Sequence, residues 1–293
     1  MFSFLRRRPL VSICLPIWRS EAFVGETLRS ALAQTVRDVE LVISNDGASP
    51  TPALDAFRER RNVRIYEPRE RLGWVANTNF VLGEARGRYV MVLPHDDRLE
   101  PTYVEACLRM LEGDPDCFSA VSDMAYVGGV MTVSEVRGEL PQRLAHVMRN
   151  LYNGYCYRAL MRNRRADRER LRLLPNPPTD FCVDTTWILQ QAVFGELRRV
   201  PEPLYVKAYL PGSTHRSWSR IPHPQLRAAW ERHCRQMEAI ALSCVPDRDF
   251  VSGLLRHRLD ARRVAEAPLY LMEAMETAEG SDVRSPPGSG ETG

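Results

Sequence analysis

A run of apolar, β-prone residues that ends in two adjacent carboxylates constrains the fold of this chain more than any other feature. Residues 89–93 are nearly all large and apolar and lie between Gly87 and Pro94, which predicts a strand buried on both faces. Asp96 and Asp97 follow this strand. Their like charges repel, and a bound divalent cation such as Mg²⁺ or Mn²⁺ would remove that cost. The alternative for an isolated Asp-Asp pair is a solvated turn before a helix, so the rest of the chain has to decide.

Segments with strand and helix patterns alternate over the first 125 residues. Strands are predicted at 10–16, 39–44, 63–66, 89–93 and 118–122. The spacing of Val24, Leu28 and Ala31 is typical of a helix between the first two strands. Such alternation indicates βαβ units and a largely parallel sheet. Right-handed crossovers then place Asp46 and Asp97 on one sheet edge, where a nucleotide could span them.

The second half of the chain is less regular. Helices are predicted at 140–151, 185–194, 226–244 and 250–265, an extended segment at 154–161 and a strand at 204–209. The arginine-rich run at 162–172 predicts a solvated helix, with a patch for an acidic substrate as the alternative.

Composition excludes several classes of function. A net charge of +3 on 293 residues is too small to indicate a nucleic-acid-binding protein. Seven cysteines without a Cys-x-x-Cys pair argue for a reducing compartment and against a zinc site. No run reaches the roughly 18 apolar residues of a membrane span, so we expect a cytoplasmic protein. At most, Arg6, Arg7 and Arg8 would make peripheral contact with an anionic membrane. Lys207 is the only lysine among 40 basic residues.

Six short motifs then occur in a fixed order. They lie at residues 11–18, 34–47, 73–77, 94–97, 183–184 and 212–215. In this order they resemble the motifs of the family 2 inverting glycosyltransferases of the GT-A fold. The resemblance implies a single α/β domain, with a Rossmann-like, mostly parallel sheet flanked by helices and a helical C-terminal extension.

The resemblance also divides the chain by role. It implies a nucleotide-sugar-binding half at 10–125 and an acceptor-binding and catalytic half at 126–216. Composition and helical pattern predict a basic N-terminal arm at 1–9, a helical extension at 217–276 and a disordered tail at 277–293. The resemblance assigns the metal, Mn²⁺ or Mg²⁺, to Asp97 and His215, with a share in the metal as the alternative role of Asp96. It assigns the nucleotide to Pro16, Trp18, Asp46, Gly73, Asn77 and Asp96. Asn45 and His95 depart from the family pattern, which often has acids there.

Asp184 is the predicted general base that takes the proton of the acceptor hydroxyl. An N-cap role at the start of the following helix is the structural alternative, and Asp180 is the second candidate for the base. The predicted reaction is metal-dependent sugar transfer from a UDP-sugar, with a dTDP-sugar as the other donor.

Two other functions stay open. A sugar-1-phosphate nucleotidyltransferase would need a glycine-rich loop after the first strand, but the first glycine is Gly25. A non-catalytic nucleotide-sugar-binding protein of the same fold is the other alternative. The sequence does not specify the sugar, the acceptor or the oligomeric state.

Overall fold

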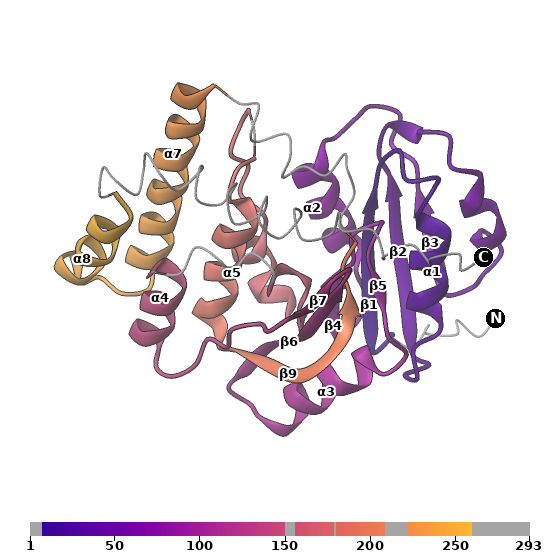
Figure 1. Ribbon diagram of the computed structural model, residues 1–293, viewed down its shortest axis with the longest axis horizontal. Coiled ribbons are helices and arrows are strands. Elements are labelled where there is room, and N and C mark those ends of the chain that lie inside the picture. The colour runs from indigo at the N-terminus through magenta and orange to yellow at the C-terminus, as the bar shows by residue number, and fades with distance from the viewer. Residues whose placement is uncertain (1–7, 150–155, 179, 209–221, 260–293) are drawn as a thin grey trace, which may run out of the picture.

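The computed structural model describes residues 8–149, 156–178, 180–208 and 222–259. One mixed sheet runs through this part of the chain (Figure 1). Its first four strands are all parallel and lie in the order β3-β2-β1-β4: β1 (Val11–Ile17), β2 (Val39–Asn45), β3 (Val63–Tyr66) and β4 (Tyr89–Val92). The remaining strands follow in the order β8-β6-β9-β5, with β7 paired to β6: β5 (Arg98–Leu99), β6 (Cys117–Tyr126), β7 (Gly129–Met131), β8 (Leu160–Arg162) and β9 (Glu196–Val206). The predicted α/β architecture is confirmed.

Helices pack against the sheet, and several of them form one end of the molecule. Those of the first half are α1 (Val24–Leu32), α2 (Trp74–Glu84) and α3 (Tyr103–Gly113), with short 3-10 turns η1 (Asp46–Ala48) and η2 (Pro52–Phe57). Those of the second half are α4 (Leu140–Arg149), α5 (Val183–Phe194), α7 (His223–Leu242) and α8 (Arg248–Leu259). These last four gather at the end of the molecule away from β1, β2 and β3 (Figure 1). The predicted helical extension is therefore present in α7 and α8.

Strands β1, β2 and β4 are buried on both faces, because their side chains alternate between two apolar cores, whereas the edge strand β3 is only partly buried. In β1, Ile13 and Leu15 belong to the larger core, whereas Cys14 belongs to the smaller one beneath α2. Six of the seven cysteines are buried, where a thiol packs as a small apolar group.

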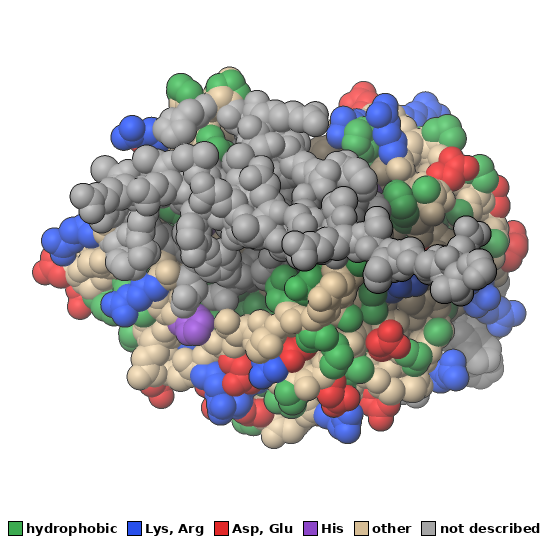
Figure 2. All heavy atoms as spheres, in the orientation of Figure 1, with side chains coloured by type: hydrophobic (Ala, Val, Ile, Leu, Met, Phe, Trp, Pro, Cys, Tyr) green, Lys and Arg blue, Asp and Glu red, His purple; other side chains and the backbone are tan. Residues whose placement is uncertain are grey.

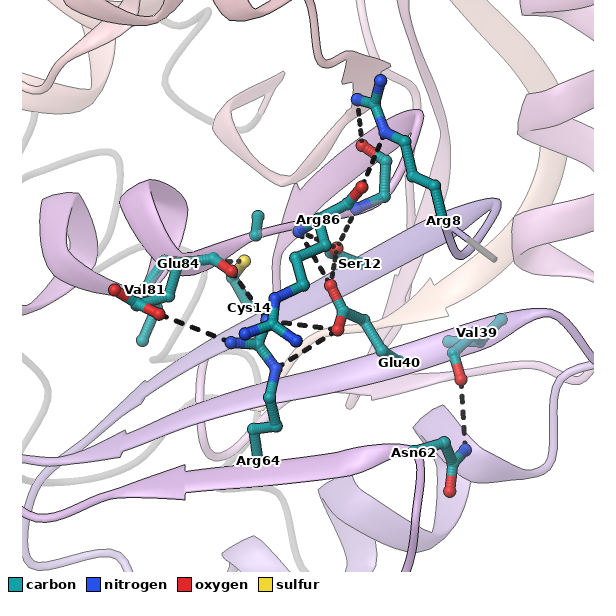
Figure 3. A network of polar contacts seen from close by, with 12 residues as sticks. Arg8, Ser12, Cys14, Val39, Glu40, Asn62, Arg64, Val81, Glu84 and Arg86 are labelled. Atoms are coloured by element: carbon teal, nitrogen blue, oxygen red, sulfur yellow. Dashed lines mark hydrogen bonds and ion pairs between the residues drawn. The ribbon is translucent and has the colours of Figure 1, made fainter. Parts of the chain in front are cut away.

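A buried ion pair fastens the amino ends of the strands to the end of α2 (Figure 3). Glu40 accepts hydrogen bonds from the Ser12 hydroxyl at 2.5 Å, the Arg86 amide at 2.8 Å and the Arg64 guanidinium at 3.1 Å. Arg8 donates to the Arg86 and Gly87 carbonyls. At least this residue of the basic N-terminal arm therefore stabilises the fold rather than extending into solvent.

The arginine-rich run is a solvated helix only in part. Arg162 is the last residue of β8, and the run continues as a 3-10 helix, η4 (Arg165–Leu171), in which only Leu171 is buried. Arg162 donates to the carbonyl of Cys117 at 2.8 Å, and Arg168 to that of Ala85 at 2.7 Å. Both side chains bind backbone groups of neighbouring elements, because a guanidinium can satisfy several carbonyls at once. On the face seen in Figure 2, acidic and basic side chains are intermixed among the coloured residues.

Candidate active site

The carboxyl ends of β1, β2 and β4 meet at one edge of the sheet. Ile17 pairs with Asn45 at the ends of β1 and β2, and Asp96 and Asp97 lie just beyond β4. Since parallel strands end on the same edge, sequence motifs that lie 50 to 80 residues apart become neighbours. This edge is where the sequence predicts a nucleotide.

Asp46, Gly73 and Asn77 form one hydrogen-bonded group at this edge. Asp46 is 2 % exposed, and its two oxygens accept the amides of Leu72 at 2.6 Å and Gly73 at 3.0 Å. Asn77 donates to the Ser44 carbonyl at 3.2 Å. Gly73 has φ 81° and ψ 161°, a conformation that residues with a side chain rarely adopt. The acid therefore holds the loop that leads into α2.

Trp18 lies beside this group with a guanidinium over its ring. The Arg71 guanidinium carbon is 3.7 Å from the ring centroid, and that of Arg19 is 4.6 Å from it. Trp18 and Pro16 are both half-buried. No local pattern in the sequence indicates that Arg71 stacks on a ring 53 residues earlier in the chain.

Asp97 is the most enclosed carboxylate of the site, at 1 % exposure. One oxygen accepts the Arg158 guanidinium at 2.9 Å and the Tyr205 hydroxyl at 2.7 Å, and the other accepts the Ala208 amide at 2.9 Å. The Arg158 guanidinium also lies over the ring of Tyr157, 4.3 Å from its centroid. Arg158 and Tyr205 are residues that the sequence did not identify, because their partner is 61 and 108 residues away.

Asp96 differs from its neighbour. Its side chain is half-buried, and burial, followed by the charge of Asp97, raises the pKa of its carboxyl. Burial also lowers the pKa of His95. The Asp96 carboxylate is thus the more accessible negative charge of the pair.

Asp184 faces the same group from the other half of the chain. It is half-buried in the first turn of α5, and burial raises the pKa of its carboxyl. The charge of Arg158 partly offsets the rise in the pKa of both Asp96 and Asp184. All three carboxylates in turn help to raise the pKa of the Tyr157 hydroxyl. The three carboxylates therefore lie within electrostatic range of Tyr157 and Arg158, and Asp97 contacts Arg158 directly.

The alternatives for Asp184 and Asp180 can be compared with their contacts. Cys182, not Asp184, is the N-cap of α5, and Asp184 accepts the Thr185 amide at 2.9 Å. The N-cap alternative is therefore wrong. Asp180 accepts the amide of Asn176 at 2.9 Å and has φ 51°, so its carboxylate stabilises the loop.

Asn176 joins this loop to the C-terminal extension. It is fully buried and donates to the carbonyls of Phe181 at 2.7 Å and Ala229 at 2.9 Å, while its own side-chain oxygen accepts Arg232 at 3.0 Å. Thr186 and His233 add a 2.7 Å hydrogen bond between α5 and α7. The C-terminal extension thus holds the loop that leads into α5, whose first turn carries Asp184.

We expect Asn176→Ala to lower the free energy of unfolding by about 2–4 kcal/mol, since it leaves buried carbonyls without donors. Urea denaturation measures the loss. The control is Asn79→Ala. Asn79 donates to the Leu173 carbonyl at 2.9 Å and accepts the Leu173 amide at 2.8 Å, but its side chain is partly exposed. A loss for Asn176→Ala no larger than that of the control would contradict the role assigned to this side chain.

Other parts of the predicted site can be placed only in part. His215 lies outside the described residues. Within them, no three His, Cys, Asp or Glu side chains gather in a way that could hold a metal ion. In the same ranges, no helix has both the length and the apolar character that crossing a bilayer requires.

Curated relatives match about a third of the chain. A chondroitin synthase of Pasteurella multocida (strain Pm70) is 36% identical over 110 residues, which are 36% of this chain and 11% of that protein. The putative glycosyltransferase EpsH of Bacillus subtilis (strain 168) is 32% identical over 112 residues, which are 37% of this chain and 32% of that protein. The chain therefore spans a third or less of the length of these relatives.

Solved structures match over most of the chain. S. aureus TarS 1-349 in complex with UDP-GlcNAc superposes with a TM-score of 0.67 at 14% identity, covering 86% of this chain and 73% of that one. The mannosyltransferase PcManGT from Pyrobaculum calidifontis, in complex with GDP-Man and Mn²⁺, gives 0.59 at 16% identity, covering 96% and 78%. These likenesses establish the GT-A fold.

The sheet edge with its acidic residues lies inside the region that a family model matches. The model is described as glycosyl transferase family 2, and it covers residues 12–198, well over half of the chain. The matched region includes Asp46, Asp96, Asp97 and Asp184. The chain belongs to glycosyl transferase family 2.

Proposed function

We propose that this protein transfers a sugar from a nucleotide-diphosphate sugar to an acceptor hydroxyl, with inversion and with Asp184 as the general base. The observation that carries the proposal is the convergence of Asp96, Asp97 and Asp184 around Arg158 at the carboxyl edge of the sheet. Family membership supports it. The neighbours in complex with UDP-GlcNAc and GDP-Man support a nucleotide-sugar donor.

The nucleotide would bind along Pro16, Trp18 and the loop held by Asp46. A carboxylate oxygen has two lone pairs, so Asp46 can hold Leu72 and Gly73 and still accept the N–H of a base. A uracil ring offers such an N–H, which makes a UDP-sugar our proposed donor. Trp18 would supply an aromatic surface beside the base, and Asn77 would keep β1, β2 and α2 in register beneath it.

Asp96 fits a divalent cation better than Asp97 does. The oxygens of Asp97 already accept three hydrogen bonds within the protein, whereas Asp96 is half-buried beside it with a raised pKa. A bound Mn²⁺ or Mg²⁺ ion would neutralise part of the charge of the leaving diphosphate. We therefore assign Asp96 to the cation and Asp97 to the positioning of Arg158. This proposal departs from the predicted metal role of Asp97, and the role of His215 as a ligand stays a prediction.

Asp184 would take the proton of the acceptor hydroxyl as the acceptor oxygen attacks the anomeric carbon. The new carbon–oxygen bond forms on the face opposite the leaving phosphate, and the electron pair of the broken bond stays on the phosphate oxygen. A raised pKa suits this role, because it makes the carboxylate a stronger base than an exposed aspartate. Burial thus serves the chemistry directly.

Release of UDP from UDP-sugars, measured with Mn²⁺ and again with a chelator, tests the proposal. We expect turnover that needs the cation. Tight UDP binding without turnover on any tested sugar and acceptor would favour a non-catalytic nucleotide-sugar-binding protein.

We expect Asp96→Asn to abolish the gain in UDP affinity that Mn²⁺ gives, because a neutral amide is a poor ligand for a hard cation. Calorimetric titration of UDP with and without Mn²⁺ measures this gain. The control is Asp116→Asn, an exposed aspartate in the turn before β6. An unchanged gain in Asp96→Asn would refute this assignment.

A further inference from the structure

Lys207 lies at the same sheet edge, and nothing in the proposed function so far uses it. It is the only lysine in a chain whose other basic residues are all arginine. It is also buried, at 6 % exposure, whereas a lone lysine placed by chance would be expected on the surface. This position therefore requires an explanation other than solubility or overall charge.

The backbone around Lys207 is fixed on both sides. Its amide donates to the Ala125 carbonyl at 2.8 Å, which continues the pairing of β9 with β6. Tyr205, two residues before it, and Ala208, directly after it, both bind Asp97, through the Tyr205 hydroxyl at 2.7 Å and the Ala208 amide at 2.9 Å. Lys207 therefore lies within the segment that contacts Asp97.

The charges around the ammonium are those of the site. Arg158 acts on it as a like charge, and Asp97 and Asp96 as opposite charges. Burial, followed by Arg158, lowers the pKa of Lys207 to about 8. Holding a second cation beside Arg158 in a buried place costs free energy, and such costs are typical of functional sites.

Lysine and arginine differ in what they bind. Arginine presents a flat fork that pairs with a carboxylate, as Arg158 does with Asp97. Lysine is a compact point charge with three donors, which suits a single phosphate oxygen in a small space. A chain that otherwise uses arginine throughout therefore has a chemical reason for one lysine at this edge.

We propose that the ammonium of Lys207 binds the phosphate oxygens of the donor's diphosphate and stabilises the leaving group. This inference rests on the proposed function. As the bond from the anomeric carbon to the phosphate oxygen breaks, the electron pair moves onto that oxygen, and the acceptor's proton goes to Asp184. Lys207 keeps its own proton and offsets the charge that develops on the diphosphate.

Binding of UDP compared with uridine tests this role without any need for turnover. We expect Lys207→Met to weaken UDP about 10- to 100-fold and to leave uridine unchanged, because only UDP carries the phosphates. Lys207→Arg should recover part of the loss. Titration calorimetry in Mn²⁺ and in a chelator measures both ligands. Arg256→Met, which removes an exposed cation on α8, is the control.

Thermal melting separates this role from a structural one. Methionine has a similar length and is tolerated in buried places, so we expect Lys207→Met to stay folded at the temperature of the binding assay, with a single cooperative melting transition. A drop in melting temperature with equal weakening of UDP and uridine would overturn the inference. So would unchanged UDP affinity in Lys207→Met, and in that case the proposed transferase function survives. Failure of the wild-type protein to bind both UDP and GDP would instead overturn the proposed function, and this inference with it.

Discussion

Replacing Asp184 with asparagine should lower sugar transfer about 100- to 10,000-fold while UDP binding stays intact. The amide cannot accept the acceptor's proton, but its oxygen can still accept the Thr185 amide. Initial rates of UDP release, together with the dissociation constant for UDP, measure the two effects. Wild-type turnover in this variant would end the assignment.

The control for this experiment is Asp180→Asn, four residues earlier. Its amide oxygen can keep the bond to the Asn176 amide, so the loop should hold its shape. We therefore expect its rate to remain within about tenfold of wild type, below the range typical of a lost general base. A larger loss in Asp180→Asn than in Asp184→Asn would transfer the role of base to Asp180.

The pKa of Asp184 gives the direction of two pH effects. Its folded-state pKa is raised by burial, so turnover should fall as the pH drops through that raised value, where the base becomes protonated. The same shift affects the free energy of unfolding. Below its unfolded-state pKa, Asp184 adds to this free energy, and the added stability is lost as the pH rises through the folded-state pKa. Near neutral pH, Asp184→Asn should thus melt at the same temperature as wild type or slightly higher.

Replacing Arg158 with methionine should lower the free energy of unfolding by about 3–5 kcal/mol. The change leaves the carboxyl of Asp97 buried at 1 % exposure without its guanidinium partner, while the hydrogen bonds from Tyr205 and the Ala208 amide remain. Urea denaturation measures the loss, and we expect UDP release to fall with it, because Arg158 also acts on Asp96 and Asp184.

Two further variants make this result interpretable. Arg58→Met breaks the exposed ion pairs with Asp55 and Glu67, and it should cost no more than about 1 kcal/mol. The double variant Arg158→Met with Asp97→Leu should recover part of the stability, since no unpaired charge then remains. Equal losses for Arg158→Met and Arg58→Met would show that the pair with Asp97 does not stabilise the fold.

The strands and helices of the first half could be predicted because their signals are local. Residues 89–93 are apolar on both faces, and the structure buries every residue of β4. The spacing of Val24 and Leu28 places both in the core beneath the sheet. The sequence analysis predicted only the last residues of β9. Residues 198–203 of this strand include charged side chains and two prolines, a composition that is not typical of a strand. Pairing with β6 forms it nonetheless.

The sequence by itself determined the α/β fold, the sheet edge and the acidic residues that gather there, because strand periodicity and parallel topology follow from local patterns. Only the tertiary structure decided how those acids differ. Asp96 and Asp97 are adjacent and identical in the sequence, but Arg158, Tyr205 and Ala208 all bind Asp97. These partners come from segments 61 to 111 residues away, and no local pattern records which of two neighbouring carboxylates such distant groups will meet.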